Sequence, residues 1–205
     1  MRLSVIVPSF KDPILHKTID SLLENSQLND QLEIIVCLDG YWPVKKIKDD
    51  DRIRVLHLGK NRGMRDAINA GVSISRGEFI MRTDEHCMFG KGYDRILTET
   101  CRDDWIVTAR RYYLDLDNWK IMDLPYVDYE KLVIQTVKEV KKFTGFPWEE
   151  RQEKRKNIRI DETMAMQGSG WVMSRKWWNN VIGELQTEGY GPMYQDSHEM
   201  LFKTW

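Results

Sequence analysis

Long hydrophobic runs, paired cysteines and an excess of one charge are all missing from this sequence, and each absence excludes a class of protein. No apolar run approaches the roughly 18 residues of a membrane span, and no charged and apolar leader precedes the first strand-like segment. The three cysteines lack a C-x-x-C spacing, which argues against a zinc knuckle and a disulfide framework. The 31 Lys and Arg nearly balance the 32 Asp and Glu, so no global charge draws the chain to nucleic acid. We therefore expect a soluble, cytoplasmic protein without a transmembrane segment.

Strand-like and helix-like segments alternate through the first half of the chain. Strands are expected at residues 3–7, 34–36, 53–57 and 79–82, and helices at residues 14–23 and 64–74. This alternation predicts an α/β fold with a mostly parallel central sheet flanked by helices. Ligands of such sheets bind beyond the carboxyl ends of the strands. Those ends carry Pro8-Ser9-Phe10, Asp39-Gly40 and Thr83-Asp84-Glu85-His86.

The second half of the chain is less regular. Apolar residues at helical spacing predict a helix near 129–143, and a last helix is expected from Asp196 to Trp205. The stretch 149–159 is dense in charges of both signs, and we expect it to be a mobile loop. Its lysines and arginines could meet the phosphates of a nucleic-acid acceptor, but the interleaved glutamates favour a solvated face.

Asp84 and His86 lie two residues apart at the end of a predicted strand. In extended geometry both side chains point the same way while Glu85 points oppositely, so the two can bind one ion. A divalent ion neutralises a diphosphate leaving group, and an imidazole among oxygen ligands favours Mn²⁺ over Mg²⁺. The alternative is that Asp84 caps a turn and His86 is a surface residue.

Asp196 and Glu199 are candidates for acid–base chemistry. They lie three residues apart at a predicted helix start, so they share one face, and the helix dipole favours their charge. Ordinary N-capping is the alternative to a catalytic role. His198, between them, points away from that face.

The residues just before the last predicted strand are candidates for substrate binding. Gly168, Ser169 and Gly170 let backbone approach a sugar or an acceptor closely, or else form a plain bend. Most aromatic residues of the C-terminal third are expected to be core, because aromatic side chains bury large areas. Trp171 and Tyr194 are the two that we expect to contact substrate.

The order of these motifs resembles family 2 glycosyltransferases of the GT-A fold over nearly the whole chain. The opening strand with its Pro8-Ser9-Phe10 turn is similar to that family's first strand and turn, and 33–40 to its second strand and Asp-Asp-Gly turn. The chain also matches the family's spaced pattern at Asn61, Gly63, Ala67, Asn69, Gly71, Gly77 and Glu78. The resemblance implies a GT-A fold and sugar transfer from a nucleotide-diphosphate-sugar.

Within that superfamily the motifs are closest to the catalytic domain of polypeptide N-acetylgalactosaminyltransferases. Asp84-Glu85-His86-Cys87 resembles their Asp-x-His-Cys, 166–173 their Met-Ala-Gly-Gly-Leu-Phe segment, and 196–205 their acidic helix ending Phe-Arg-x-Trp. The resemblance implies that Asp39 hydrogen-bonds the uracil of a UDP-sugar and that Asp196 contacts the acceptor, as general base in inverting members. The donor nucleotide is then expected to contact Pro8, Ser9, Phe10, Asp39, Gly63, Arg65 and Asp84.

Three positions depart from the family's pattern. Leu38 replaces the first Asp of the Asp-Asp-Gly turn, so one base or ribose contact is missing or replaced. Ile68 stands where many members carry Arg, a charge that Arg65 or Arg82 can supply. The family's further metal-ligating histidine lies beyond Trp205; either the chain is truncated, or water and phosphate complete the coordination.

The sequence thus predicts a metal-dependent hexosyl- or N-acetylhexosaminyltransferase that uses a UDP-sugar. One domain is expected over 1–205, with a nucleotide-sugar-binding half at 1–89 and an acceptor-binding half at 90–205. A non-catalytic nucleotide-sugar-binding module is one alternative. A sugar nucleotidyltransferase is another, but 8–13 contains none of the glycines of its phosphate loop. The acceptor, which can be a glycan, a protein or a small molecule, and the oligomeric state are not specified by the sequence.

Overall fold

A six-stranded sheet forms the centre of the protein. The structure is a computed structural model of the 205-residue chain, and it describes residues 1–137, 140–189 and 195–205. The strand order is β3-β2-β1-β4-β10-β5. These strands are β1 (Leu3–Ser9), β2 (Leu32–Leu38), β3 (Ile53–His57), β4 (Phe79–Thr83), β5 (Ile106–Thr108) and β10 (Gly170–Ser174).

The sheet is parallel from β3 to β4 and antiparallel on both sides of β10. This arrangement confirms the predicted mostly parallel α/β sheet. Strand β10 comes from the second half of the chain, and it pairs directly with β4, Trp171 opposite Arg82. The carboxyl end of β4, at Thr83, therefore lies opposite Gly170, the first residue of β10 and the last of the glycine segment 168–170.

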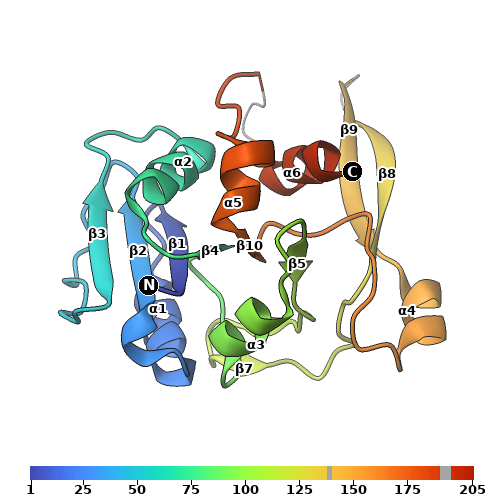
Figure 1. Ribbon diagram of the computed structural model, residues 1–205, viewed down its shortest axis with the longest axis horizontal. Coiled ribbons are helices and arrows are strands. Elements are labelled where there is room, and N and C mark those ends of the chain that lie inside the picture. Colours follow the sequence, from blue (N-terminus) through green and yellow to red (C-terminus); the bar gives the residue numbers. More distant parts are fainter. Residues whose placement is uncertain (138–139, 190–194) are drawn as a thin grey trace.

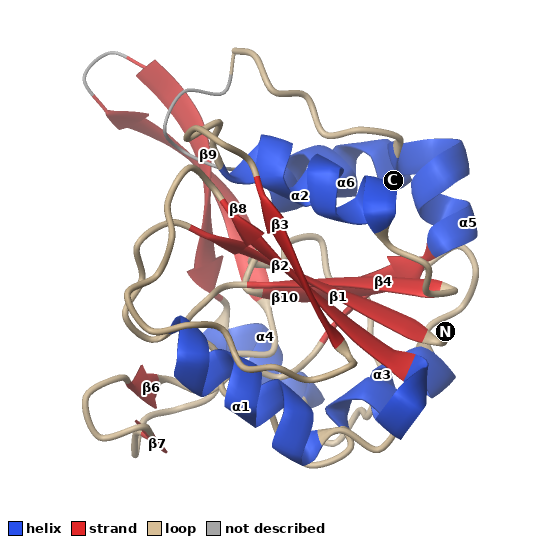
Figure 2. Ribbon diagram, turned by 90° about the vertical axis from the view of Figure 1, so that its left-hand side faces the viewer, coloured by secondary structure: helices blue, strands red, loops and turns tan. Residues whose placement is uncertain are grey.

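Helices cover both faces of the sheet (Figure 2). One face carries α1 (Leu15–Asn25) and α3 (Tyr93–Thr100), and the other carries α2 (Met64–Ile74), α5 (Arg175–Trp177), a π-helix (Trp178–Ile182) and α6 (Asp196–Thr204). Buried side chains of α1 pack with one face of β1 and β2, and those of α2 with the other face. Because both faces are covered, β1 and β2 are apolar almost throughout, as the sequence indicated. Within the described residues, no helix is both long and apolar enough to cross a membrane.

The helix predicted near 129–143 is wrong. This region forms an antiparallel hairpin of β8 (Glu130–Val137) and β9 (Val140–Pro147), which stands beside α6 at the end of the molecule away from β3 (Figure 1). Its apolar residues fit a helical spacing, but the run from 132 to 137 is rich in β-branched residues, which favour a pleated strand. Two small strands, β6 (Leu114–Asp115) and β7 (Lys120–Ile121), form a further pair.

The loop predicted at 149–159 is also partly wrong, because its first part forms α4 (Glu149–Arg155). The charges that suggested a solvated loop stabilise this helix: acidic residues lie in its first turn and basic residues in its last. Lys154 donates to Glu150 one turn earlier at 2.6 Å. The other predicted elements are found, with α6 at 196–204 and α2 at 64–74.

Candidate active site

Three predicted loops meet at the carboxyl edge of the parallel strands. Ser9 ends β1, while Asp39 and Asp84 directly follow β2 and β4. The Ser9 hydroxyl is hydrogen-bonded to the Tyr41 hydroxyl, which joins the first loop to the second. The Phe10 ring lies edge-on to the Tyr41 ring and is half exposed. This edge therefore carries polar and aromatic groups, as expected for ligand binding in parallel sheets.

Hydrogen bonds of Glu85 link the turn after β1 to the turn after β4. The Phe10 backbone N–H donates to both carboxylate oxygens of Glu85, at 3.0 and 3.1 Å, and the Thr18 hydroxyl donates to the Glu85 carbonyl at 2.9 Å. Burial raises the pKa of Glu85, and hydrogen bonds from Ser9 and Phe10 oppose that shift. Pro8 and Ser9 are buried, so Phe10 is the residue of this turn that offers its side chain to a ligand.

Asp39 is buried, and its carboxylate binds the loop before α2. Oδ1 accepts from the Arg62 N–H at 2.7 Å, while Oδ2 accepts from the Gly63 N–H at 2.8 Å and from Asn61 Nδ2 at 2.9 Å. Gly63 has a φ of 93°, a conformation that favours glycine. Both oxygens accept hydrogen bonds and the residue is 3% exposed, so Asp39 shapes this loop in the structure. Its expected contact with uracil stays a prediction. Leu38 is fully buried and offers no polar substitute.

Arg82 on β4 lies at the centre of the candidate site and is buried, with its side chain 2% exposed. Its Nη2 donates to Asp84 Oδ1 at 2.5 Å and contacts Met64 Sδ at 2.8 Å, and its Nη1 donates to the Gly168 carbonyl. Arg82 therefore connects the candidate metal ligand after β4 to the glycine segment before β10.

Gly168 lies where Arg82 and Asp196 come together. A Cβ on Gly168 would be 2.8 Å from Arg82 Nη1 and 2.9 Å from Asp196 Oδ1, so another residue would displace one of these charged groups. The close approach predicted for this segment is thus made by the protein's own charges. The carbonyls of Ser169 and Gly170 accept from hydroxyls on β4 and β5, which fixes the segment.

Asp196 is the first residue of α6 and is buried. Its Oδ2 accepts from Trp171 Nε1 at 3.4 Å. The Trp171 ring is 0% exposed, and in this structure its N–H holds Asp196. Its expected contact with substrate stays a prediction. Burial lowers the pKa of the neighbouring His198, against the charges of Asp196 and Glu130. Tyr194 lies outside the described residues.

Glu199, the second predicted catalytic carboxylate, is enclosed by cations. It forms ion pairs with Arg65 of α2 and with Lys203 at 2.8 Å, and it accepts from the Gln186 N–H at 3.2 Å. Arg65 also donates to the Gln186 carbonyl. Both Glu199 and Arg65 are buried, so this pair fastens α6 to α2 in the structure. The ligand contacts predicted for each stay predictions.

Asp84 and His86 lack the extended geometry assumed for them, because β4 ends at Thr83 and 85–86 form a turn. His86 is 46% exposed in its side chain, and its Nδ1 lies 2.8 Å from Asp12 Oδ2. Among the described residues, no three Cys, His, Asp or Glu side chains are gathered closely enough to hold a metal by themselves. The carboxylate and imidazole fit a divalent cation whose other ligands are phosphate and water.

A comparison with protein families matches the chain, over residues 4–181, to the model described as "Glycosyl transferase family 2". The match runs from β1 through the glycine segment to the π-helix. The chain belongs to glycosyl transferase family 2.

One protein of similar sequence and one solved structure of similar fold can be compared with this family 2 glycosyltransferase. A human dolichyl-phosphate beta-glucosyltransferase is 36% identical over 98 residues, which cover 40% of this chain and 30% of that protein. A crystal structure of GalNAc-T7 with UDP, GalNAc and Mn²⁺ matches with a TM-score of 0.75 at 14% identity, covering 100% of this chain and 40% of that one. The second match confirms the GT-A fold. The chain spans less than half the length of either protein.

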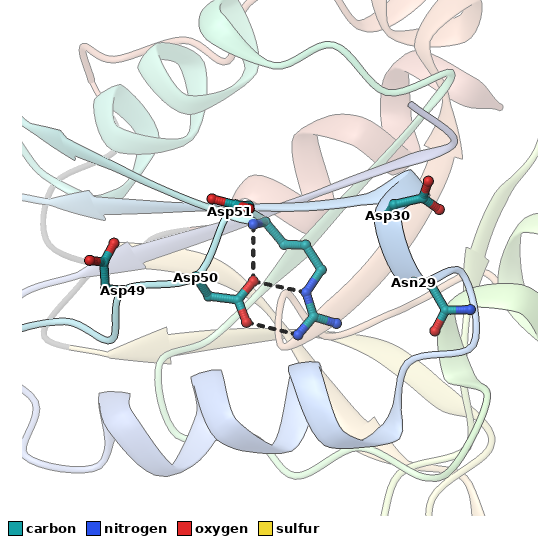
Figure 3. A pocket seen from close by; sticks show the side chains of 6 residues that line it. Asn29, Asp30, Asp49, Asp50 and Asp51 are labelled. Carbon is teal, nitrogen blue, oxygen red and sulfur yellow. Dashed lines mark hydrogen bonds and ion pairs between the residues drawn. The ribbon is translucent and has the colours of Figure 1, made fainter.

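A surface hollow of about 660 Å³ lies away from the site of this family 2 glycosyltransferase (Figure 3). Its residues precede β2 and β3, so it lies at the amino ends of the strands, opposite to the edge where parallel sheets bind ligands. Bonds from Arg52 occupy the Asp50 carboxylate. The hollow is lined by Asn29, Asp30, Asp49, Asp50, Asp51 and Arg52.

Three site residues of this glycosyltransferase were missed or only partly seen in the sequence. Asp12 precedes the first predicted helix; its Oδ1 accepts from the Ile14 N–H at 2.6 Å, and its Oδ2 contacts His86. Glu85 had no assigned task, and Arg82 was considered only as a substitute charge. Each acts through a partner on another loop, which spacing along the chain does not reveal.

Proposed function

We propose that this family 2 glycosyltransferase moves a hexose or N-acetylhexosamine from a UDP-sugar to an acceptor hydroxyl, with a divalent cation at Asp84 and His86. The observation that carries the proposal is the meeting of Asp84 and Asp196 around Arg82 and Gly168. These carboxylates come from opposite ends of the chain, the first from a donor half at 1–89 and the second from an acceptor half at 90–205. The cation and nucleotide are supported by GalNAc-T7, which shares the fold and was solved with UDP and Mn²⁺.

The reaction replaces the bond between the anomeric carbon and the diphosphate oxygen with a bond to the acceptor oxygen. A divalent cation, when bound, stabilises the negative charge that develops on the departing diphosphate. Asp196 accepts the proton of the acceptor hydroxyl, and attack opposite the leaving group inverts the anomeric carbon. Trp171 holds Asp196 at Oδ2, and Arg82 holds Asp84 at Oδ1, so each carboxylate keeps one oxygen available.

Two other functions fit part of the site. A binding module without turnover would keep the nucleotide pocket and is compatible with having only two metal-ligand candidates. A sugar nucleotidyltransferase would need a glycine-rich phosphate loop after β1, and residues 8–13 have no glycine. Hydrolysis of a UDP-sugar in the presence of Mn²⁺ separates these functions, because a binding module leaves the donor intact.

The metal assignment predicts that Asp84→Asn and His86→Ala each abolish Mn²⁺-dependent binding of UDP. Calorimetry measures the binding, and circular dichroism checks that each variant is folded. The matched control is Asp20→Asn, which removes an exposed carboxylate on α1 that pairs with Lys48 and should bind UDP normally. Wild-type affinity in either site variant would overturn the metal assignment.

The donor assignment predicts tighter binding of UDP than of GDP in the same buffer. A thermal-shift comparison suits this test, because a ligand at about 100 times its dissociation constant adds about 2.7 kcal/mol to the stability of the native state. The Asp39 carboxylate already accepts hydrogen bonds from the 61–63 loop. The preference for UDP over GDP is therefore expected only if backbone groups of the loops after β1 and β2 hydrogen-bond to the base. An equal or reversed preference would assign the enzyme to another nucleotide.

A further inference from the structure

The side chains of Asp12 and His86 join the loop after β1 to the turn after β4. His86 Nδ1 lies 2.8 Å from Asp12 Oδ2. The other oxygen of Asp12 accepts from the Ile14 N–H at 2.6 Å, and Pro13 separates the two residues. This bond within its own loop fixes the Asp12 carboxylate, so His86 meets an acceptor whose position is already set.

A neutral imidazole carries one N–H, and its position decides which ring nitrogen can bind a cation. A carboxylate accepts hydrogen bonds but donates none, so Asp12 favours the form in which Nδ1 carries the proton. The Nε2 lone pair is then available. The adjacent Glu85 carboxylate accepts from the Phe10 N–H, and no hydrogen bond joins it to His86 among the described residues.

We propose that Asp12 is a positioning residue for the cation site: it fixes the ring and the tautomer of His86 so that Nε2 faces the cation. This inference rests on the proposed function, since it takes His86 as a metal ligand. Histidines that bind metals commonly donate their second ring N–H to a carboxylate or carbonyl, and loss of that partner weakens metal binding about 10–100-fold. Asp12 lies on the same loop as Phe10. Its contact with His86 therefore also places the proposed cation site beside the loop that is proposed to bind the nucleotide.

The pair adds little to folding, which makes the role testable. His86 is 46% and Asp12 19% exposed in their side chains, and partly exposed pairs contribute little stability. Asp12→Ala is therefore expected to fold. Asp12→Asn keeps an acceptor at the same place but adds an N–H₂ that can donate to the opposite tautomer.

The first measurement is made on the metal-free protein. Nitrogen-15 NMR of the histidine rings, in the neutral form, reports which nitrogen carries the proton, and the His86 signals are those that disappear in His86→Gln among the four histidines. Wild-type His86 should have its proton on Nδ1. In Asp12→Ala the two tautomers should mix, and Asp12→Asn should lie between.

The second measurement titrates Mn²⁺ into each protein by calorimetry, with Asp20→Asn as the control for the loss of one carboxylate. The dissociation constant should rise about 10–100-fold in Asp12→Ala and less in Asp12→Asn. An unchanged tautomer and an affinity within twofold of wild type in Asp12→Ala would overturn the role of Asp12 alone. A wild-type protein that fails to bind Mn²⁺, with or without UDP, would instead overturn the cation site itself.

Discussion

Buried charge gathers around one glycine in this enzyme. Arg82 and Asp196 approach the same point beside Gly168, and Asp84 lies at the other end of the Arg82 guanidinium. Charges removed from water are tolerated only when they are paired and hydrogen-bonded. The arrangement therefore holds two carboxylates in place before any ligand arrives.

For Asp196→Asn, we predict a loss of sugar transfer of roughly 10²–10⁴-fold with donor affinity nearly unchanged, because the variant lacks only the proton acceptor. Transfer is followed by release of UDP and donor affinity by calorimetry. Asp103→Asn, an exposed carboxylate in a surface ion pair, serves as the control. Loss of donor binding to the extent expected for Asp84→Asn would move Asp196 to the donor site, and a normal transfer rate would make it a helix cap.

Individual site residues were predictable when they belong to a motif whose order along the chain is recognisable. They were missed when their role depends on a contact with a residue far away in the sequence. Asp84 and Asp196 were predicted because each belongs to a recognisable motif, and their roles stay predictions. Arg82 and Asp12 were not assigned their contacts, since these depend on which loops meet in space. Asp39 was expected at the base, but the loop that it binds follows a separate strand.

Two helices from opposite halves of the chain are fastened together by one buried ion pair. Arg65 lies in the first turn of α2 and Glu199 in the first turn of α6. The pair lies close to Asp196, so its geometry sets the position of α6 and with it that of the proposed base.

Glu199→Gln should therefore destabilise the protein by about 3 kcal/mol, because it removes the negative charge from a buried ion pair. Urea denaturation measures the change, with Glu188→Gln on the exposed loop before residue 190 as the control. A catalytic Glu199 would give the opposite pattern, in which transfer is lost while the unfolding midpoint stays at the wild-type value.

Element types were predictable where apolar residues are periodic and the segment is packed on both sides. Strands β1 and β2 and helix α2 satisfy this condition. The hairpin β8–β9 does not satisfy it, because several of its apolar residues, such as Ile134 and Phe143, are exposed. Their spacing therefore does not show which face of the hairpin is buried. The helix α4 was missed because its stability comes from charge placement, which composition alone does not reveal.

One buried carboxylate cross-links the parallel part of the sheet at the edge opposite to the proposed active site. Glu33 on β2 accepts from Ser4 Oγ of β1 at 2.5 Å and from the Arg76 N–H before β4, and it pairs with Arg54 of β3. Burial by itself would raise the pKa of Glu33, but the hydrogen bonds from Ser4 and Arg76 outweigh it and leave the pKa below its ordinary value of 4.5. Three strands of the parallel part and the loop before the fourth thus share one ionised group.

A Glu33→Gln variant should lose about 2 kcal/mol of stability at neutral pH, as expected for hydrogen bonds to a charged group. A lowered pKa means that this contribution is present above pH 4.5 and is lost as the pH falls through the folded-state value. The stability difference between wild type and variant should therefore shrink on acidification below 4.5. Urea titrations at several pH values measure it, and a difference that stays constant would exclude ionised Glu33 as its source.

The insertion of β10 between β4 and β5 has a consequence for synthesis. As the chain leaves the ribosome, β1 to β4 can pair in order, but the free edge of β4 waits until residues 170–174 have emerged. An unpaired edge in a growing chain is a site for association with other strands. A nascent protein stalled after residue 89 should therefore need a chaperone, and completion of the glycine segment should be the event that releases it.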